Sequence, residues 1–173
     1  MKTFMIEVSD PSMLYLAKVV AKRLEDRGME QSSDAEFTLK VKICAQSRAD
    51  SYQITGKPTS LTVIADSLIN AYAGVGAVLY GSKYDVDGII PTEARGYTTP
   101  DCTMRCVYTA THFHTYYWMA PLDELFDYYD DLALMGINQI HIGQPFFGTA
   151  DNDRELEEAL DRLAEIQHHI TSL

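Results

Sequence analysis

The last seventy residues alternate short β-branched runs with longer amphipathic stretches, and this alternation constrains the fold more than any other feature. Strands are expected over 104–111 and 137–142, and helices over 122–135 and 153–170. Two strands that are each followed by a helix run parallel, because the helix carries the chain back across the sheet. Two parallel strands leave sheet edges open and their faces only partly covered. The sequence therefore predicts the start of a larger parallel β/α structure.

The helix signals in this segment are clear. Pro121 suits the first turn of a helix, Asp123 and Glu124 favour its positive dipole end, and Gly136 follows its last turn. Apolar residues then recur at three- and four-residue steps in both helices. The expected buried positions are Leu122, Leu125, Phe126, Tyr129, Leu132 and Ala133 in the first helix, and Leu156, Ala159, Leu160, Leu163, Ile166 and Ile170 in the second.

The first part of the chain has a different order of elements. Strands are expected over 4–8, 36–45, 50–55 and 60–65, with a turn at 56–58, and helices over 11–27 and 68–84. The stretch EFTLKVKICA alternates apolar with polar residues, so one face of its strand is buried and the other is wetter. The order is β-α-β-β-β-α.

The expected helix over 68–84 is rich in small residues. Gly74 and Gly76 would weaken an isolated helix, so they indicate close packing of its backbone against the sheet. A glycine-rich phosphate loop is the functional alternative. Neither the dinucleotide fingerprint nor the spacing of a nucleotide-triphosphate loop is present.

Proline and glycine interrupt regular structure repeatedly between the two parts. We therefore predict an α+β domain over 1–88, a linker over 89–101 and a separate segment over 102–173.

Composition excludes several classes of partner. Twenty-five acidic residues against fourteen Lys and Arg give a formal net charge of −11, which disfavours nucleic acid and anionic membranes. Cys44, Cys102 and Cys106 lack the spacing of a disulfide framework. Glu7 and Asp10 interrupt the apolar run that a signal peptide needs, although the localisation of a longer parent protein stays open.

Two stretches carry a resemblance to a known group of enzymes. SLTVIADSLINAYAGVGAVLYG is similar to a strand-then-helix segment, and APLDELFDYYDDLALMGINQIHIG to a first barrel helix and second barrel strand, of certain glycoside hydrolases. The chain resembles the N-terminal half of family 20 β-hexosaminidases and family 67 α-glucuronidases. The resemblance implies a small β-α-β-β-β-α domain followed by the first βαβα units of an incomplete (β/α)₈ TIM barrel.

The resemblance also implies what this chain lacks. A closed barrel needs about 250 residues, so the chain would be a fragment that is inactive alone. The catalytic carboxylates of hexosaminidases lie on a later strand, so no catalytic residue is assigned here. Those enzymes place a substrate-binding arginine just after the first barrel strand. Here only Arg154 and Arg162 follow His112, and both fall in the last helix, a departure that bears on hexosamine specificity.

The candidate site lies where the two expected barrel strands end. Barrel enzymes place functional side chains at the C-terminal ends of strands, and aromatic rings with His or Gln suit sugars. The predicted substrate-binding residues are His112, His114, Tyr116, Trp118 and Gln144. The alternative is that Tyr117 and Trp118 only pack against the small domain.

Other chemistry-bearing residues receive structural interpretations. His112 and His114 could begin a metal-dependent hydrolase barrel, but two ligands are too few for a metal site, and no metal or cofactor is predicted. His141 is expected to be a satisfied core histidine, and His168 and His169 a solvated helix end. The acidic residues of the two helices are expected on wet faces; they are Asp127, Asp130, Asp131, Glu155, Glu157, Glu158, Asp161 and Glu165.

The sequence thus favours the N-terminal part of a carbohydrate-active glycoside hydrolase, with a carbohydrate as the partner of the whole protein. A non-catalytic binding module is the alternative, and a metal-dependent hydrolase a weaker one. A homodimer through the exposed barrel segment is left open.

Overall fold

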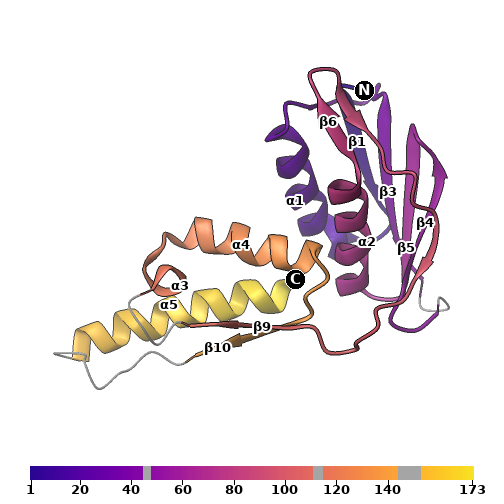
Figure 1. Cartoon of the computed structure of the whole chain (residues 1–173). Coiled ribbons are helices and arrows are strands. Elements are labelled where there is room, and N and C mark those ends of the chain that lie inside the picture. The colour runs from indigo at the N-terminus through magenta and orange to yellow at the C-terminus, as the bar shows by residue number, and fades with distance from the viewer. Residues whose placement is uncertain (45–47, 111–114, 144–152) are drawn as a thin grey trace. The chain divides into compact units, whose positions relative to one another are not determined.

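The computed structural model describes residues 1–44, 48–110, 115–143 and 153–173, and Figure 1 shows the whole chain. Within these residues the protein is α+β and divides into two units. The first unit comprises Met1–Thr103 and Ala133–Gly136, and the second comprises Met104–Leu132 and Ile137–Leu173. Each unit is described by itself.

A six-stranded mixed sheet forms the first unit, with the order β2-β1-β3-β5-β4-β8. Its strands are β1 (Thr3–Val8), β2 (Glu30–Gln31), β3 (Phe37–Ile43), β4 (Tyr52–Lys57), β5 (Ser60–Ala65) and β8 (Gly96–Thr98). β1, β2, β3 and β5 are parallel, whereas β4 runs antiparallel to β5 and β8. The predicted order β-α-β-β-β-α is confirmed, and β2 and β8 are additions that the sequence analysis missed.

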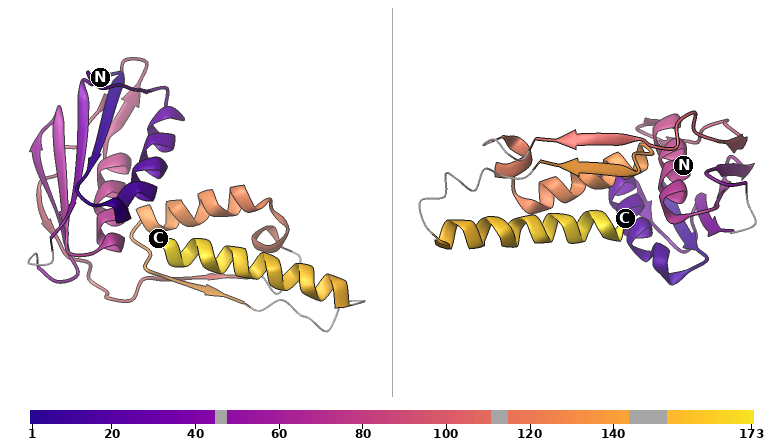
Figure 2. Two further views of the ribbon diagram at one scale, coloured as in Figure 1. Left: turned by 180° about the vertical axis from the view of Figure 1, so that it is seen from behind. Right: turned by 90° about the horizontal axis from the view of Figure 1, so that it is seen from below.

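Two helices lie on one face of this sheet (Figures 1 and 2). A short 3-10 turn, η1 (Pro11–Met13), leads into α1 (Leu14–Glu25), and α2 (Leu68–Gly81) follows β5. Asp10 caps the turn by accepting a hydrogen bond from the Ser12 amide over 2.8 Å, and this bond lowers the pKa of Asp10. Gly28, at φ 79°, follows the end of α1 as expected.

The core of the first unit lies between the helices and the sheet. Phe37, Leu39 and Val41 alternate along β3 and are at most 1% exposed, which confirms the buried face of that strand. Gly74 of α2 explains the small residues of this helix. A Cβ atom at position 74 would lie 2.6 Å from Cγ1 of Val63 and 3.0 Å from the Tyr52 ring, so the helix backbone lies directly on β4 and β5.

Part of the stretch that the sequence analysis assigned to a linker is regular structure. β7 (Gly88–Ile90) forms a hairpin with β6 (Lys83–Asp85), and β8 pairs with β4 as a sheet strand. The helix predicted over 68–84 is therefore too long, because α2 ends at Gly81 and the chain turns into β6. These strands are three residues long, too short to give an alternation pattern, and the glycines that begin β7 and β8 dominate the sequence signal.

The described residues of the second unit form two parallel strands and three helices. β9 (Cys106–Thr109) pairs with β10 (Gln139–Ile142) in register from Cys106 opposite Gln139 to Thr109 opposite Ile142. The helices are α3 (Tyr116–Met119), α4 (Leu122–Leu134) and α5 (Asp153–Ser172). Figure 1 shows α4 and α5 on one side of the two strands. The predicted strand-helix-strand-helix order is confirmed, and α3 is an addition to it.

The core of this unit lies between the two helices and the inner face of the strands. Leu125, Tyr129, Leu132 and Ile166 are its buried centre, and Val107, Ile140 and Ile142 pack against it from the strands. The predicted apolar stripes of α4 and α5 therefore hold in outline. Leu160 is the exception, since 47% of it is exposed.

Two predicted solvent-facing residues are in fact buried together. His169 Nε2 lies 3.0 Å from Asp130 Oδ1, and the two residues are 8% and 4% exposed. The ring of Phe126 stacks on the His169 ring with a centroid distance of 4.2 Å. The wet-face prediction for Asp130 and the solvated-terminus prediction for His169 are therefore wrong, whereas His168 is exposed as expected.

The prediction that His141 is a satisfied core histidine is also wrong. Its side chain is exposed on the strand face that points away from α4 and α5, where it makes an edge-on ring contact with Tyr108.

Neither α5 nor any other helix in the described part of the chain has the length and hydropathy to cross a membrane.

Candidate functional site

The carboxyl ends of β9 and β10 lie side by side, as the parallel pairing requires. The amide of Gly143 donates to the carbonyl of Thr109 over 3.1 Å, and the Thr109 hydroxyl donates to the carbonyl of His141 over 3.3 Å. In parallel β/α structures this end of the sheet carries the binding loops. Thr109 and Gly143 therefore mark one shared end of the two strands.

The segment after β9 returns as the short helix α3. The Thr115 hydroxyl donates to the carbonyl of Ala110 over 2.7 Å and so ties the start of α3 to the end of β9. The amides of Trp118 and Met119 both donate to the Thr115 carbonyl, at 3.0 and 2.9 Å. These bonds fix the aromatic run Tyr116–Trp118 in one place.

Tyrosines from α3 and α4 form a contiguous cluster. The Tyr116 and Tyr117 rings lie 5.9 Å apart, those of Tyr117 and Tyr128 5.5 Å, and those of Tyr128 and Tyr129 5.6 Å. Tyr116 is 52% exposed, and its hydroxyl lies 3.4 Å from Glu124 Oε2. Partial burial and then this carboxylate raise the pKa of Tyr116.

Tyr128 has the most perturbed pKa of these phenols. Burial first, and then its hydrogen bond with Tyr117 and the neighbouring phenols, raise its pKa from 10 to about 12. The proton is held more tightly in the folded state. Tyr128 therefore contributes stability that is fully present below pH 10 and is lost as the pH rises through about 12.

This pH dependence can be measured with a matched variant. We expect the urea midpoint of the wild type to fall between pH 10 and about 12 more steeply than that of Tyr128→Phe, which has no phenol to ionise. Parallel pH profiles for the two proteins would show that Tyr128 does not titrate in this window.

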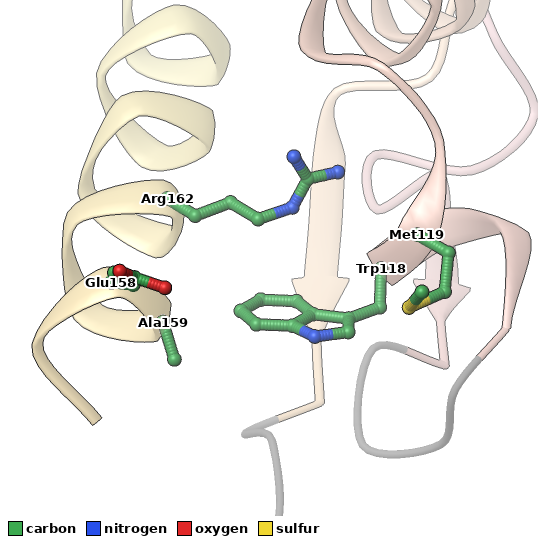
Figure 3. Close-up of a pocket in the computed structure, with 5 residues that line it drawn as sticks. All are labelled: Trp118, Met119, Glu158, Ala159 and Arg162. Atoms are coloured by element: carbon green, nitrogen blue, oxygen red, sulfur yellow. The ribbon is translucent and has the colours of Figure 1, made fainter. Parts of the chain in front are cut away.

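A pocket of about 300 Å³ opens beside α3 and α5. Among the described residues it is lined by Trp118, Met119, Glu158, Ala159 and Arg162. Figure 3 shows the indole of Trp118 on one side, the guanidinium of Arg162 above it, and Glu158 and Ala159 opposite. The pocket thus has an aromatic wall with one cation and one anion at its rim, all within the second unit.

Arg162 is held in this pocket by two contacts. Its guanidinium carbon lies 5.6 Å from the centroid of the Trp118 ring, and its Nη2 donates to the carbonyl of Ala120. Its Nε is buried and has no hydrogen-bond partner among the residues described. Glu158 is paired instead with Arg154, over 2.8 Å.

A second buried donor belongs to the same region. The hydroxyl of Tyr129 has no hydrogen-bond partner within the described ranges, although the Thr109 hydroxyl is close enough to influence it. Burial raises the pKa of Tyr129, whereas Thr109 and the Arg162 cation oppose that rise. Tyr129 and Arg162 therefore lie within electrostatic reach of each other.

The structure brings together only some of the predicted site residues. Trp118 lines the pocket, whereas Tyr116 faces solvent beside Glu124. The predicted ligands His112, His114 and Gln144 lie outside the described residues. Among the residues that are described, no three His, Cys, Asp or Glu side chains gather as a metal site would require.

Sequence reasoning placed Arg162 in the last helix and assigned it no role in the site. The spacing does hold a signal. Arg162 lies three residues after Ala159 and four before Ile166, so it falls on the apolar stripe of α5. His169, three residues after Ile166, falls on the same stripe. A polar residue on a buried stripe indicates a specific partner.

Comparison with known proteins supplies a fold and no family assignment. No family model matches the sequence, and no curated protein is significantly similar to it. Solved structures do match. A family 20 chitobiase from Flavobacterium johnsoniae has a TM-score of 0.68 and 18% identity over 99% of this chain and 30% of its own.

Two further structures agree with this match. A family 20 exo-β-N-acetylglucosaminidase from Vibrio harveyi has a TM-score of 0.62 and 13% identity, covering 83% of this chain and 22% of its own. A family 138 enzyme that targets pectin rhamnogalacturonan II has a TM-score of 0.65 and 11% identity, covering 98% of this chain and 23% of its own.

The chain spans about a quarter of the length of the solved structures it matches. The predicted likeness to family 20 is supported, and the likeness to family 67 α-glucuronidases is not. At identities below 20% these matches establish the fold alone. The chain shares its fold with part of the glycoside hydrolases of families 20 and 138.

Proposed function

We propose that this chain is part of a glycoside hydrolase, in which β9, α4, β10 and α5 are the first two β/α units of a (β/α)₈ barrel. The six-stranded first unit, which includes β8 from the predicted linker, is the small domain that supports the barrel. The observation that carries this proposal is the parallel pair β9–β10, whose helices α4 and α5 lie on one face, while no described element covers the other.

The outer face of these strands is what a barrel would enclose. Cys106, Tyr108, Gln139 and His141 alternate with the core residues of β9 and β10, and all four are exposed. In a barrel the helices pack outside and these alternate residues point to the interior. Further strands would cover Tyr108, which is now 52% exposed, and His141.

The fold comparisons support the same assignment. The matching structures are glycoside hydrolases of families 20 and 138, and each is three to five times as long as its matched part. The catalytic carboxylates of the two-carboxylate mechanism would lie on strands beyond this chain. The reaction is therefore assigned to the whole protein.

The side chains at the ends of β9 and β10 would form one wall of the sugar cleft. Trp118 offers a flat apolar face for a pyranose ring, and Tyr116 offers a phenol that reaches solvent. His112, His114 and Gln144 remain predicted contributors.

The test is hydrolysis of a panel of aryl glycosides by a protein that carries this chain followed by the further β/α units. We expect turnover of at least one member of the panel by that protein and none by residues 1–173 alone. A well-folded longer protein that hydrolyses no member of the panel would contradict the proposal. Sugar binding without turnover would favour a carbohydrate-binding module.

A further inference from the structure

The pocket beside Trp118 holds the cation Arg162, which has no carboxylate partner among the residues that the structure describes. Within the part of the chain that the structure describes, no carboxylate pairs with Arg162, because Glu158, the acid nearest in the pocket wall, pairs with Arg154. Arg162 is also withdrawn from bulk water, since its Nε is buried and its guanidinium lies over an indole ring. A half-buried cation of this kind is costly unless an anion compensates it.

The other residues that line the pocket indicate which kind of ligand would carry such an anion. Trp118, Met119 and Ala159 supply apolar surface, and Glu158 supplies a carboxylate at the rim. An indole face suits the C–H face of a sugar ring, and a carboxylate accepts hydrogen bonds from sugar hydroxyls. A volume of about 300 Å³ is at the small end of ligand pockets and matches a single ring.

We propose that this pocket binds a uronic acid residue, with the sugar ring on Trp118, its carboxylate at the guanidinium of Arg162 and a hydroxyl at Glu158. The inference rests on the proposed function, because it names acidic glycans as the substrate class of the same cleft wall. It adds a specificity-determining residue, Arg162. Arginine suits this role since its planar group binds carboxylates by two parallel hydrogen bonds.

The position of the pocket agrees with this role. Glu158, Ala159 and Arg162 lie in the first half of α5, and α3 directly follows the loop after β9. Both elements therefore belong to the end of the unit at which β9 and β10 terminate, which is the end where barrels bind substrate. The buried hydroxyl of Tyr129 lies within electrostatic reach of Arg162 and is a further donor at this end.

Trp118 makes the test direct, because it is the only tryptophan in the chain. Fluorescence of residues 1–173 is titrated with the methyl glycosides of galacturonic and glucuronic acid. The methyl esters of the same two compounds are the ligand controls, since they keep the ring and remove the charge. We expect saturable quenching by at least one acid, and binding of its ester weaker by about tenfold.

Variants of two arginines on α5 then separate a specific contact from general charge. Arg162→Met is expected to abolish the preference for the acid, and Arg162→Lys, which keeps the charge without the planar fork, to reduce it. Arg154→Met is the matched control, because Arg154 is 85% exposed and is absent from the pocket wall. It is expected to retain the preference. Circular dichroism establishes that each variant is folded.

Several outcomes would overturn the inference. They are no saturable change with either acid, equal binding of acid and ester, or equal losses in the Arg154 and Arg162 variants. The ligand comparison on the wild type remains decisive even if Arg162→Met does not fold. A longer protein that cleaves neutral glycosides while this pocket ignores uronates would refute the inference alone. Uronate binding by an inactive longer protein would refute only the glycosidase proposal.

Discussion

Replacing Gly74 by leucine is expected to destabilise the first unit by about 3 kcal/mol or more. The first added atom would already lie 2.6 Å from Cγ1 of Val63 and 3.0 Å from the Tyr52 ring, and both neighbours belong to sheet strands. The helix α2 would have to move away from β4 and β5. Leucine favours helix formation over glycine by roughly 1 kcal/mol, which offsets only part of this cost. Urea denaturation followed by circular dichroism measures the difference.

Gly81→Ala is the matched control on the same helix. At Gly81 the nearest atoms to an added Cβ belong to the Thr92 side chain, at 3.1 Å and beyond, so a small shift relieves the contact, whereas the 2.6 Å approach to Val63 at Gly74 is much closer. We expect a change within about 1 kcal/mol of the wild type. Equal stability of Gly74→Leu and Gly81→Ala would show that α2 does not lie tightly on the sheet.

Removing the carboxylate of Asp130 is the second change with a large expected effect. Asp130→Ala leaves His169 buried between α4 and α5 without the oxygen that lies 3.0 Å from its Nε2. Loss of one partner of a buried pair costs about 3 kcal/mol. The ring of Phe126 on the other side of His169 offers stacking but no hydrogen-bond acceptor. Chemical denaturation monitored by the fluorescence of Trp118, in the same unit, reports the loss.

Asp130→Asn tests whether the charge or the hydrogen bond matters. The amide keeps an oxygen acceptor at the same position, so we expect it to recover more than half of the stability lost in Asp130→Ala. Glu157→Ala, on the exposed face of α5, controls for loss of negative charge and is expected to change little. Equal stability of Asp130→Ala and Glu157→Ala would contradict a structural role for the buried pair.

The elements that the sequence predicts well are those whose periodicity runs for several residues. β3 alternates over its whole length, and α4 and α5 repeat apolar residues over three or more turns, so burial on one face determines both patterns. β2, β7 and β8 have only two or three residues each. Strands this short form because neighbouring strands offer hydrogen bonds, and that information is not local.

The candidate site shows the same division. Trp118 was predicted from its place after the first strand of the second unit, and it does line a pocket. Asp130 and His169 were assigned to solvent, and Arg162 was given no role in the site, because charged residues on helices usually face water. Each of them instead has a partner that is distant in the sequence. Arg162 lies over Trp118, and Asp130 of α4 pairs with His169 of α5. Such pairs follow from how the helices pack, which one sequence does not reveal.

The central claim is that β9 and β10 begin a larger parallel barrel and are incompletely covered in residues 1–173. Hydrogen exchange followed by mass spectrometry tests it most directly, with β3 and β5 of the same chain as the internal standard. We expect the amides of β9 and β10 to exchange much faster than those of β3 and β5 in residues 1–173, and to become protected in a protein that includes the further β/α units. Protection of β9 and β10 equal to that of β3 and β5 in residues 1–173 alone would contradict the claim.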